Sequence, residues 1–173
     1  EGDYWRIVIL LAVGHLVHSN QEYDKPRLLI EELDPPELAE TPQAWQQVWL
    51  AGEVFLELGV PRAKDTSHGK RLLKRTRSHL TQLVEEAHLS SEERLKAGDV
   101  LGQLGDPRPG VGVIREGEWE IPQVDWVEIP SGSFTMGSEE EDEDAWDDEK
   151  PAHELHLNSY FIARYPLTND QYR

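Results

Sequence analysis

The sequence predicts an α+β chain in which an N-terminal α-helical array is followed by short strands and a final helix. Up to residue 104, apolar residues recur at three- and four-residue spacing between capping signals, which is typical of amphipathic helices. From residue 126 onward, short alternating runs are separated by Pro, Gly and Asn turns, which is typical of strands. We therefore divide the chain into a helical repeat-like domain (1–108), a Gly/Pro-rich connector (109–123) and a strand-containing domain (124–173).

Two helices are expected before residue 40. The middle of the first (3–20) is apolar nearly all round, which predicts burial against neighbouring helices. Its apolar stretch of about a dozen residues is short for a membrane span, which needs about 20, so we expect no membrane partner. The second helix (27–33) is expected to stop at Asp34, because two prolines follow.

Three longer helices follow. Thr41 caps the first of them, and Pro42 occupies its first helical position. The second is expected over residues 71–87, and the third begins at a capping box formed by Ser90 and Glu93. Short polar connections between these helices predict helical hairpins of the kind that stack in solenoids.

The strand-containing domain begins with two short runs, 126–129 and 133–137, on either side of a Pro-Ser-Gly turn. Alternation around such a turn predicts a β-hairpin. Further strands are expected at 153–157 and 160–164, and Thr168 is expected to cap a final helix.

Three segments of this domain occur in the order that is typical of one enzyme family. They are IPSGSFTMGS (129–138), DEKPAH (148–153) and YFIARYPLTNDQY (160–172). Over residues 126–173 the chain resembles the start of the formylglycine-generating-enzyme (sulfatase-modifying factor) family. The resemblance implies a variant of the C-type lectin fold, of which residues 124–173 would be the N-terminal part.

The family resemblance implies one of two uses. Active members oxidise a substrate cysteine to formylglycine with copper and two cysteines, or carry out related iron-dependent sulfoxide chemistry. Many bacterial members instead lack the catalytic cysteines and display a variable binding surface, including targets of diversity-generating retroelements. In the family, the catalytic residues lie in a later part of the domain. We therefore expect no catalytic, cofactor-binding or metal-binding residue in this span, with copper or calcium only in that later part.

A second resemblance concerns the end of the helical part, RLKAGDVLGQLGDPR (94–108). It resembles the ends of HEAT-like helical repeats in signalling proteins. In bacterial NACHT-type (STAND) ATPases, such helices link the ATPase to a C-terminal sensor. The resemblance implies that the partner is another protein, or an ATPase or effector domain upstream in the same protein.

The chain is strongly acidic, with 17 Lys and Arg against 34 Asp and Glu and a net charge of -17. Phosphate binding needs a basic stripe, so we expect no nucleic-acid partner. The absence of cysteine removes a disulfide framework, a thiolate metal site and a cysteine nucleophile. It is also compatible with the cytoplasmic location that we expect.

Two charged clusters form the candidate interaction surface. The acidic cluster consists of Glu139, Glu140, Glu141, Asp142, Glu143, Asp144, Asp147 and Asp148. It has the oxygen ligands that Ca²⁺ prefers but not the spacing of an EF-hand loop, which favours a solvated loop or one that meets a basic partner. The basic cluster consists of Lys70, Arg71, Lys74 and Arg75. It would bind phosphate or an acidic partner, the acidic cluster included, or pair with Glu85 or Glu86.

Two pairs of histidines are weak candidates for metal ligands. His153 and His156 have an odd spacing, so they face opposite sides of a strand. His15 and His18 lie about one helical turn apart, but the sequence shows no third ligand. We therefore expect neither pair to bind a metal.

We hypothesise a non-catalytic ligand- or protein-binding sensor module of a bacterial STAND/NACHT-type signalling or defence protein. The reason is that an enzyme of the resembling family needs no helical array ahead of it. Three alternatives stay open. They are the N-terminal fragment of a formylglycine-generating-type metal-dependent oxidase, a regulatory protein processed by a protease at Arg173, and a variable protein of a diversity-generating retroelement.

Overall fold

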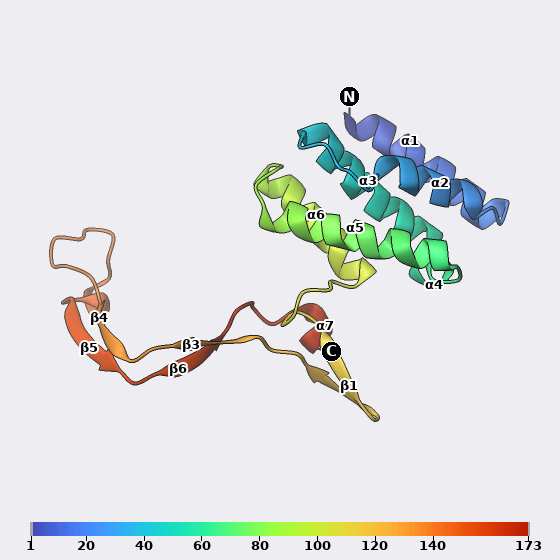
Figure 1. The fold of residues 1–173 in the computed structure, drawn as a ribbon. Coiled ribbons are helices and arrows are strands. Elements are labelled where there is room, and N and C mark those ends of the chain that lie inside the picture. Colours follow the sequence, from blue (N-terminus) through green and yellow to red (C-terminus); the bar gives the residue numbers. More distant parts are fainter. Residues whose placement is uncertain (1, 173) are drawn as a thin grey trace. The chain divides into compact units, whose positions relative to one another are not determined.

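The computed structural model describes residues 2–172, with the side chains of residues 4–169, 171 and 172 (Figure 1). The chain divides into two compact units, one ending at Arg108 and the other beginning at Pro109. We call them the helical unit and the strand unit. The protein is therefore of mixed α+β composition, with helices followed by small antiparallel strands.

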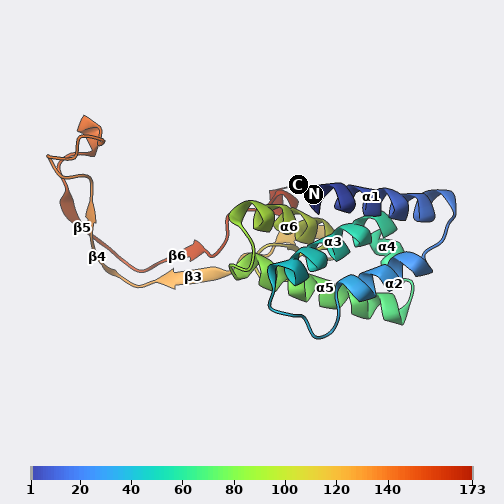
Figure 2. The same cartoon turned by 90° about the horizontal axis from the view of Figure 1, so that it is seen from above.

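The helical unit is built around one central helix. In chain order its elements are α1 (Gly2–Gly14), a π-helical turn η1 (His15–Ser19), α2 (Asp24–Leu33), α3 (Pro42–Leu58), α4 (Val60–Ala63), α5 (Ser67–Glu85) and α6 (Ser91–Leu104). The central helix α3 contacts α1, α2, α5 and α6 (Figure 1, Figure 2). Its fully buried Phe55 and Leu58 share one apolar core with Leu80, Leu83 and Leu101. Burial of side chains of this size contributes about 1.5–3 kcal/mol each, so this core stabilises the unit.

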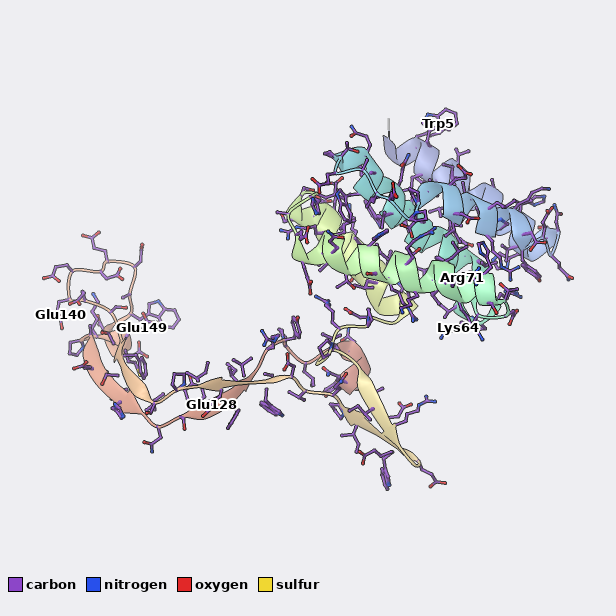
Figure 3. All side chains as sticks on the ribbon, in the orientation of Figure 1. Trp5, Lys64, Arg71, Glu128, Glu140 and Glu149 are labelled. Carbon is purple, nitrogen blue, oxygen red and sulfur yellow. The ribbon has the colours of Figure 1, made fainter. Side chains whose placement is uncertain are left out.

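The first helix is less buried than its composition predicts. Val13 of α1 and Val17 of η1 are buried, and Arg6 pairs with Glu53 of α3. Trp5, in contrast, is 64% exposed and projects from the outer side of α1 (Figure 3). The expected all-round burial is therefore wrong, because α1 packs mainly on α3. No helix in the described part of the chain is both long and apolar enough to cross a membrane.

Local capping signals determine where α3 and α6 begin. The Thr41 hydroxyl accepts a hydrogen bond from the Ala44 amide at 3.3 Å, ahead of Pro42 at the first helical position. At α6, the Ser90 hydroxyl accepts from the Glu93 amide at 3.3 Å, and the Glu93 carboxylate accepts from the Ser90 amide at 3.1 Å. Both predicted helix starts are confirmed, and a cap of this kind contributes about 1 kcal/mol.

The capping box of α6 predicts a pH dependence of stability. Hydrogen bonds from the side chains of Ser90 and then Gln46 lower the pKa of Glu93 below its ordinary value. A carboxylate with a lowered folded-state pKa stabilises the fold above its unfolded-state pKa of about 4.3, and this contribution is lost as the pH falls through the folded-state pKa. We expect Glu93→Gln to lower the melting temperature at neutral pH but hardly at all below both pKa values. Thermal unfolding of both proteins across this range checks the prediction, and a constant difference would contradict it.

Helix α5 begins at Ser67 rather than at residue 71, where its apolar spacing starts. The Thr66 hydroxyl accepts from the Gly69 amide at 3.0 Å and caps the helix. Gly69 lies so close to α4 that a Cβ atom would come within 2.1 Å of the Ala63 carbonyl oxygen. The start of α5 thus depends on a close approach to α4, which the pattern of α5 alone does not reveal.

The described part of the strand unit contains six short strands. In chain order its elements are β1 (Val113–Glu116), β2 (Trp119–Pro122), β3 (Trp126–Ile129), β4 (Gly132–Met136), a 3-10 turn η2 (Asp147–Glu149), β5 (His153–Leu157), β6 (Tyr160–Ala163) and α7 (Asn169–Tyr172). Strands β1 and β2 pair as an antiparallel hairpin, with Ile114 opposite Ile121. Residues 109–123 therefore contain a hairpin where their Gly and Pro content predicts a connector. The prediction missed this hairpin because main-chain hydrogen bonds between residues 113–116 and 119–122 form it, and Gly and Pro content does not reveal such pairing.

The other four strands form one long two-stranded ribbon. β3 pairs with β6, and β4 pairs with β5, both antiparallel. Because β3 and β4 follow each other along the same side of this ribbon, the predicted hairpin between them is wrong. The Pro-Ser step at 130–131 interrupts the ribbon but does not reverse the chain. The reversal instead occurs in residues 137–152, which join β4 to β5 at one end of the ribbon (Figure 1).

Apolar side chains of the strand unit are widely exposed. Trp119, Trp126 and Phe161 are 76%, 60% and 61% exposed. A two-stranded ladder leaves both faces open and is marginally stable alone. Exposed apolar surface on this scale is typical of surfaces that a further layer or a partner covers.

Candidate functional site

The acidic cluster lies in the loop that closes the β4–β5 end of the ribbon. The Ser138 amide donates to the Glu149 carbonyl oxygen at 2.8 Å, which closes the base of the loop. Lys150 Nζ donates to the Glu140 carbonyl oxygen at 3.0 Å across the loop. Figure 3 shows Glu140 and Glu149 together at this end of the strand unit. Hydrogen bonds to backbone carbonyl oxygens thus hold the loop, and most of its carboxylates take no part in these bonds.

All eight predicted acidic residues of this loop are exposed. Among the described residues, none of their carboxylates forms an ion pair with Lys or Arg. The same part of the chain contains no group of three His, Asp or Glu residues that would hold a metal ion. The loop therefore presents a dense negative charge on a short paired ribbon.

Gly137 explains how the loop leaves β4. Its φ angle is +93°, a left-handed conformation that favours glycine. A Cβ atom at this position would lie 2.6 Å from the Glu149 carbonyl oxygen and 2.9 Å from that of Pro151. The glycine of the MGS motif (136–138) is thus required by the close approach of the two chain segments at the base of the loop.

Three of the four histidines in the two pairs have a local polar neighbour in the structure. His156 Nδ1 lies 3.3 Å from the Ser133 hydroxyl, and His153 Nδ1 lies 3.0 Å from the Pro151 carbonyl oxygen. His18 Nε2 lies 3.5 Å from the Glu57 carboxylate. Each of these three histidines thus has one polar neighbour within its own unit.

The basic cluster lies on α5 and divides between the helix surface and the interior. Lys70, Arg71 and Lys74 are exposed. Arg75 turns inward, where its Nε lies 3.6 Å from the Asp34 carboxylate and its side chain is 20% exposed. Its inclusion in the predicted surface is therefore wrong, because this position on α5 faces the end of α2.

Lys64 extends the exposed part of the cluster. It follows α4 directly, is exposed, and is labelled in Figure 3 at the end of the helical unit where α4 contacts α5. We call Lys64, Lys70, Arg71 and Lys74 the α5 cation face. Sequence reasoning missed Lys64 because it assigned basic residues to the helix alone. Counting charge over residues 62–77, which carry seven Lys or Arg and one acidic residue, would have found it.

The expected carboxylate partners of the cluster lie elsewhere. Glu85 is 3.9 Å from Arg108, and Glu86 is 2.6 Å from His88. The predicted pairing of the basic cluster with Glu85 or Glu86 is therefore wrong. Hydrogen bonds from Gln82 and His88 lower the pKa of Glu86. The Glu86 carboxylate therefore interacts with the end of α5 and the α5–α6 connection, not with the basic cluster.

A buried polar cluster lies on the inner side of α5. The Asp34 carboxylate is fully buried and accepts a hydrogen bond from the Thr76 hydroxyl at 2.5 Å. His79 Nδ1 lies 2.6 Å from its other oxygen, and Arg75 approaches from the same helix. A buried carboxylate is tolerated only with such partners. This cluster therefore ties α2 to α5, and the sequence revealed only that Asp34 ends a helix.

A hydrogen-bonded clamp joins α7 to the β1–β2 hairpin. The Gln171 side-chain amide donates to the carbonyl oxygens of Gly110, Gly112 and Gln123 at 3.1, 3.1 and 2.6 Å. The Thr168 hydroxyl donates to the Val111 carbonyl oxygen at 2.9 Å. The Thr-Asn-Asp-Gln motif (168–171) therefore has a structural role here.

Two ionic and main-chain contacts close the ribbon beside this clamp. The Arg164 amide donates to the Asp125 carbonyl oxygen at 2.8 Å, and Arg164 Nε donates to the Asp125 carboxylate at 2.5 Å. The carboxylate raises the pKa of the Arg164 guanidinium.

The cap that the sequence predicts at Thr168 is confirmed, since the Gln171 main-chain amide donates to the Thr168 hydroxyl at 3.3 Å.

Comparison with known proteins identifies the strand unit only. Residues 114–173 match the family model of the sulfatase-modifying factor enzyme 1-like domain. This range includes the ribbon, the acidic loop and Gln171, but begins after three carbonyl groups of the clamp, at residues 110–112. Neither the curated proteins nor the solved structures gave a match. The family resemblance of residues 126–173 is thus confirmed, and the resemblance of the helical unit to NACHT/STAND proteins and HEAT-like repeats stays a prediction.

The arrangement is suited to binding by charge. Exposed charges of one sign on a supported element attract an oppositely charged partner and accelerate association. The acidic loop and the α5 cation face both have this property, each within its own unit. Each surface is a separate candidate binding site within its own unit.

Proposed function

We propose that this chain is a non-catalytic binding and sensing module of a signalling protein. In this proposal, the strand unit belongs to a sulfatase-modifying-factor-type domain of C-type-lectin fold that binds a ligand or protein. The helical unit, of HEAT-like type, links it to a STAND/NACHT-type ATPase or effector domain. The observation that carries the proposal is the direct succession of a compact helical unit ending at Arg108 and family-matched residues from 114 onward.

The surface chemistry supports a binding role. The acidic loop is exposed on the ribbon, and the α5 cation face lacks carboxylate partners among the described residues. Charges left unpaired on a folded surface repel each other, so their clustering lowers stability slightly. A partner of opposite charge would remove this repulsion, and we expect that partner to be a protein.

A second candidate function is the N-terminal part of a metal-dependent oxidase. The matched family model carries the name of an enzyme, which favours it. Such an oxidase would need two cysteines and copper supplied from outside these residues, because this chain contains no cysteine. Arg173, the processing site in another alternative, lies outside the described residues.

An aldehyde assay on the natural full-length protein separates the two candidates. The copper-loaded protein is incubated with a cysteine-containing substrate peptide, and formylglycine is detected by the mass change of the peptide. We expect no conversion above a protein-free control. In parallel, light scattering with and without ATP should show a nucleotide-dependent change of assembly. Copper-dependent conversion of the peptide would overturn the proposal.

A further inference from the structure

The α5 cation face stands out because its charges have no carboxylate partners in the part of the chain that the structure describes. Elsewhere in the helical unit, exposed lysines form ion pairs, such as Lys25 with Glu22 at 2.7 Å and Lys96 with Glu92 at 2.8 Å. Within the described residues, Lys64, Lys70, Arg71 and Lys74 have no such pair. Carboxylates are plentiful, since the chain has twice as many acidic as basic residues. The other two lysines of the helical unit are thus paired with carboxylates, whereas the three lysines of this face are not paired with any described carboxylate.

The spacing on α5 gathers three of these charges on one side of the helix. Lys70 and Lys74 are four residues apart and so lie one above the other, with Arg71 beside them. Lys64, after α4, adds a fourth charge at the same end of the unit (Figure 3). Their inward neighbours Leu72, Leu73 and Thr76 are buried, which holds α5 in place beneath the face.

The size of the face limits what it binds. Lys70 and Lys74 lie about 6 Å apart along the axis of α5 at the helical rise. An extended peptide covers that distance with about two residues. The face therefore matches a short segment that carries several carboxylates.

The surrounding charge argues against a long polyphosphate. Residues 1–108 carry 13 Lys and Arg against 18 Asp and Glu, so the helical unit as a whole is acidic. Asp65 lies within the basic segment, and Glu31 lies 3.5 Å from His68 on the first turn of α5. A nucleic acid that extended past the face would meet these carboxylates and be repelled.

We propose that the α5 cation face binds a short acidic peptide segment of a protein partner. The inference rests on the proposed binding function and names the chemistry of the partner at this surface. Lysine-rich faces attract carboxylates as point charges without a fixed bidentate geometry. Binding is therefore expected to depend on charge density more than on sequence, and to weaken with salt.

The test uses the natural full-length protein and a labelled peptide with the sequence of residues 138–150, SEEEDEDAWDDEK. A control peptide carries Asn and Gln in place of Asp and Glu. Fluorescence anisotropy is expected to show binding of the acidic peptide at about 50 mM salt, loss of binding at about 500 mM salt, and no binding of the control. Equal binding of the two peptides would overturn the proposal.

A matched pair of variants locates the surface. Lys70→Glu with Lys74→Glu is expected to weaken peptide binding by about tenfold or more. Lys96→Glu with Arg115→Glu changes the net charge equally at other exposed positions and should alter binding less than about twofold. Circular dichroism confirms that both variants keep their helix content. Equal losses in the two variants would show a general charge effect and overturn the assignment.

Other occupants give distinct results. Tighter binding of a single-stranded DNA oligonucleotide than of the peptide would assign the face to polyphosphate and overturn the proposal. A salt-sensitive dimer that is lost in the Lys70→Glu, Lys74→Glu variant would assign it to a second copy and also overturn it. The aldehyde assay tests the proposed function independently, so failure of peptide binding without aldehyde formation rejects this inference alone.

Discussion

Replacing Asp34 by Ala is expected to lower the free energy of unfolding of the helical unit by about 3–5 kcal/mol. The carboxylate is fully buried and is the acceptor for Thr76 and His79, with Arg75 nearby. Its removal leaves the buried Thr76 hydroxyl and the His79 ring nitrogen without their partner, and each such group costs about 1–3 kcal/mol. Urea unfolding followed by far-ultraviolet circular dichroism measures the change, because the helices dominate that signal.

Two control variants sharpen this test. Asp34→Asn keeps one acceptor oxygen and should lose less stability than Asp34→Ala. Asp24→Ala removes a carboxylate that is 89% exposed and pairs with Arg27, so its effect should stay within about 1 kcal/mol. If Asp34→Ala were as mild as Asp24→Ala, the buried cluster would not be what holds α2 against α5.

Replacing Gln171 by Ala is the second large expected effect. The side-chain amide satisfies three main-chain carbonyl groups of the β1–β2 region, and no apolar side chain can replace these hydrogen bonds. At about 0.5–1.5 kcal/mol for each net hydrogen bond, the strand unit should lose about 2–4 kcal/mol. Gln171→Glu should be worse at neutral pH, because it turns a carboxylate toward three carbonyl oxygens.

Limited proteolysis measures the Gln171 effect locally. Trypsin cleavage after Arg115, in β1, should become at least about tenfold faster in Gln171→Ala, because hairpin opening follows the lost stability. Asn169→Ala is the matched control, since Asn169 is exposed on the same short helix. Equal cleavage rates in the two variants would show that the clamp does not hold the hairpin.

Helix starts could be predicted because their signals are local. The Thr41 hydroxyl reaches an amide three residues later, and so do the hydroxyls of Ser90 and Thr168. Such contacts form within one turn whatever the rest of the chain does. The same holds for the strand 153–157, whose alternating pattern is a property of adjacent residues.

Strand pairing could not be predicted in the same way. The turn residues at 130–131 favour a hairpin, yet β3 pairs with β6, which lies across the acidic loop in the sequence. The pairing depends on main-chain hydrogen bonds between distant segments, and a local turn signal does not identify the partner. The family motifs located the strands correctly but carried no information on which strands pair.

The candidate site shows the same division. Composition alone identified the acidic loop and the basic helix, because charge density is a property of the sequence. Only packing determined that Arg75 turns toward Asp34 while Lys70, Arg71 and Lys74 face solvent. The reason is that helix periodicity predicts which residues share a face of α5 but not which neighbouring element packs on that face. The packing of α2 against α5 is what buries Arg75.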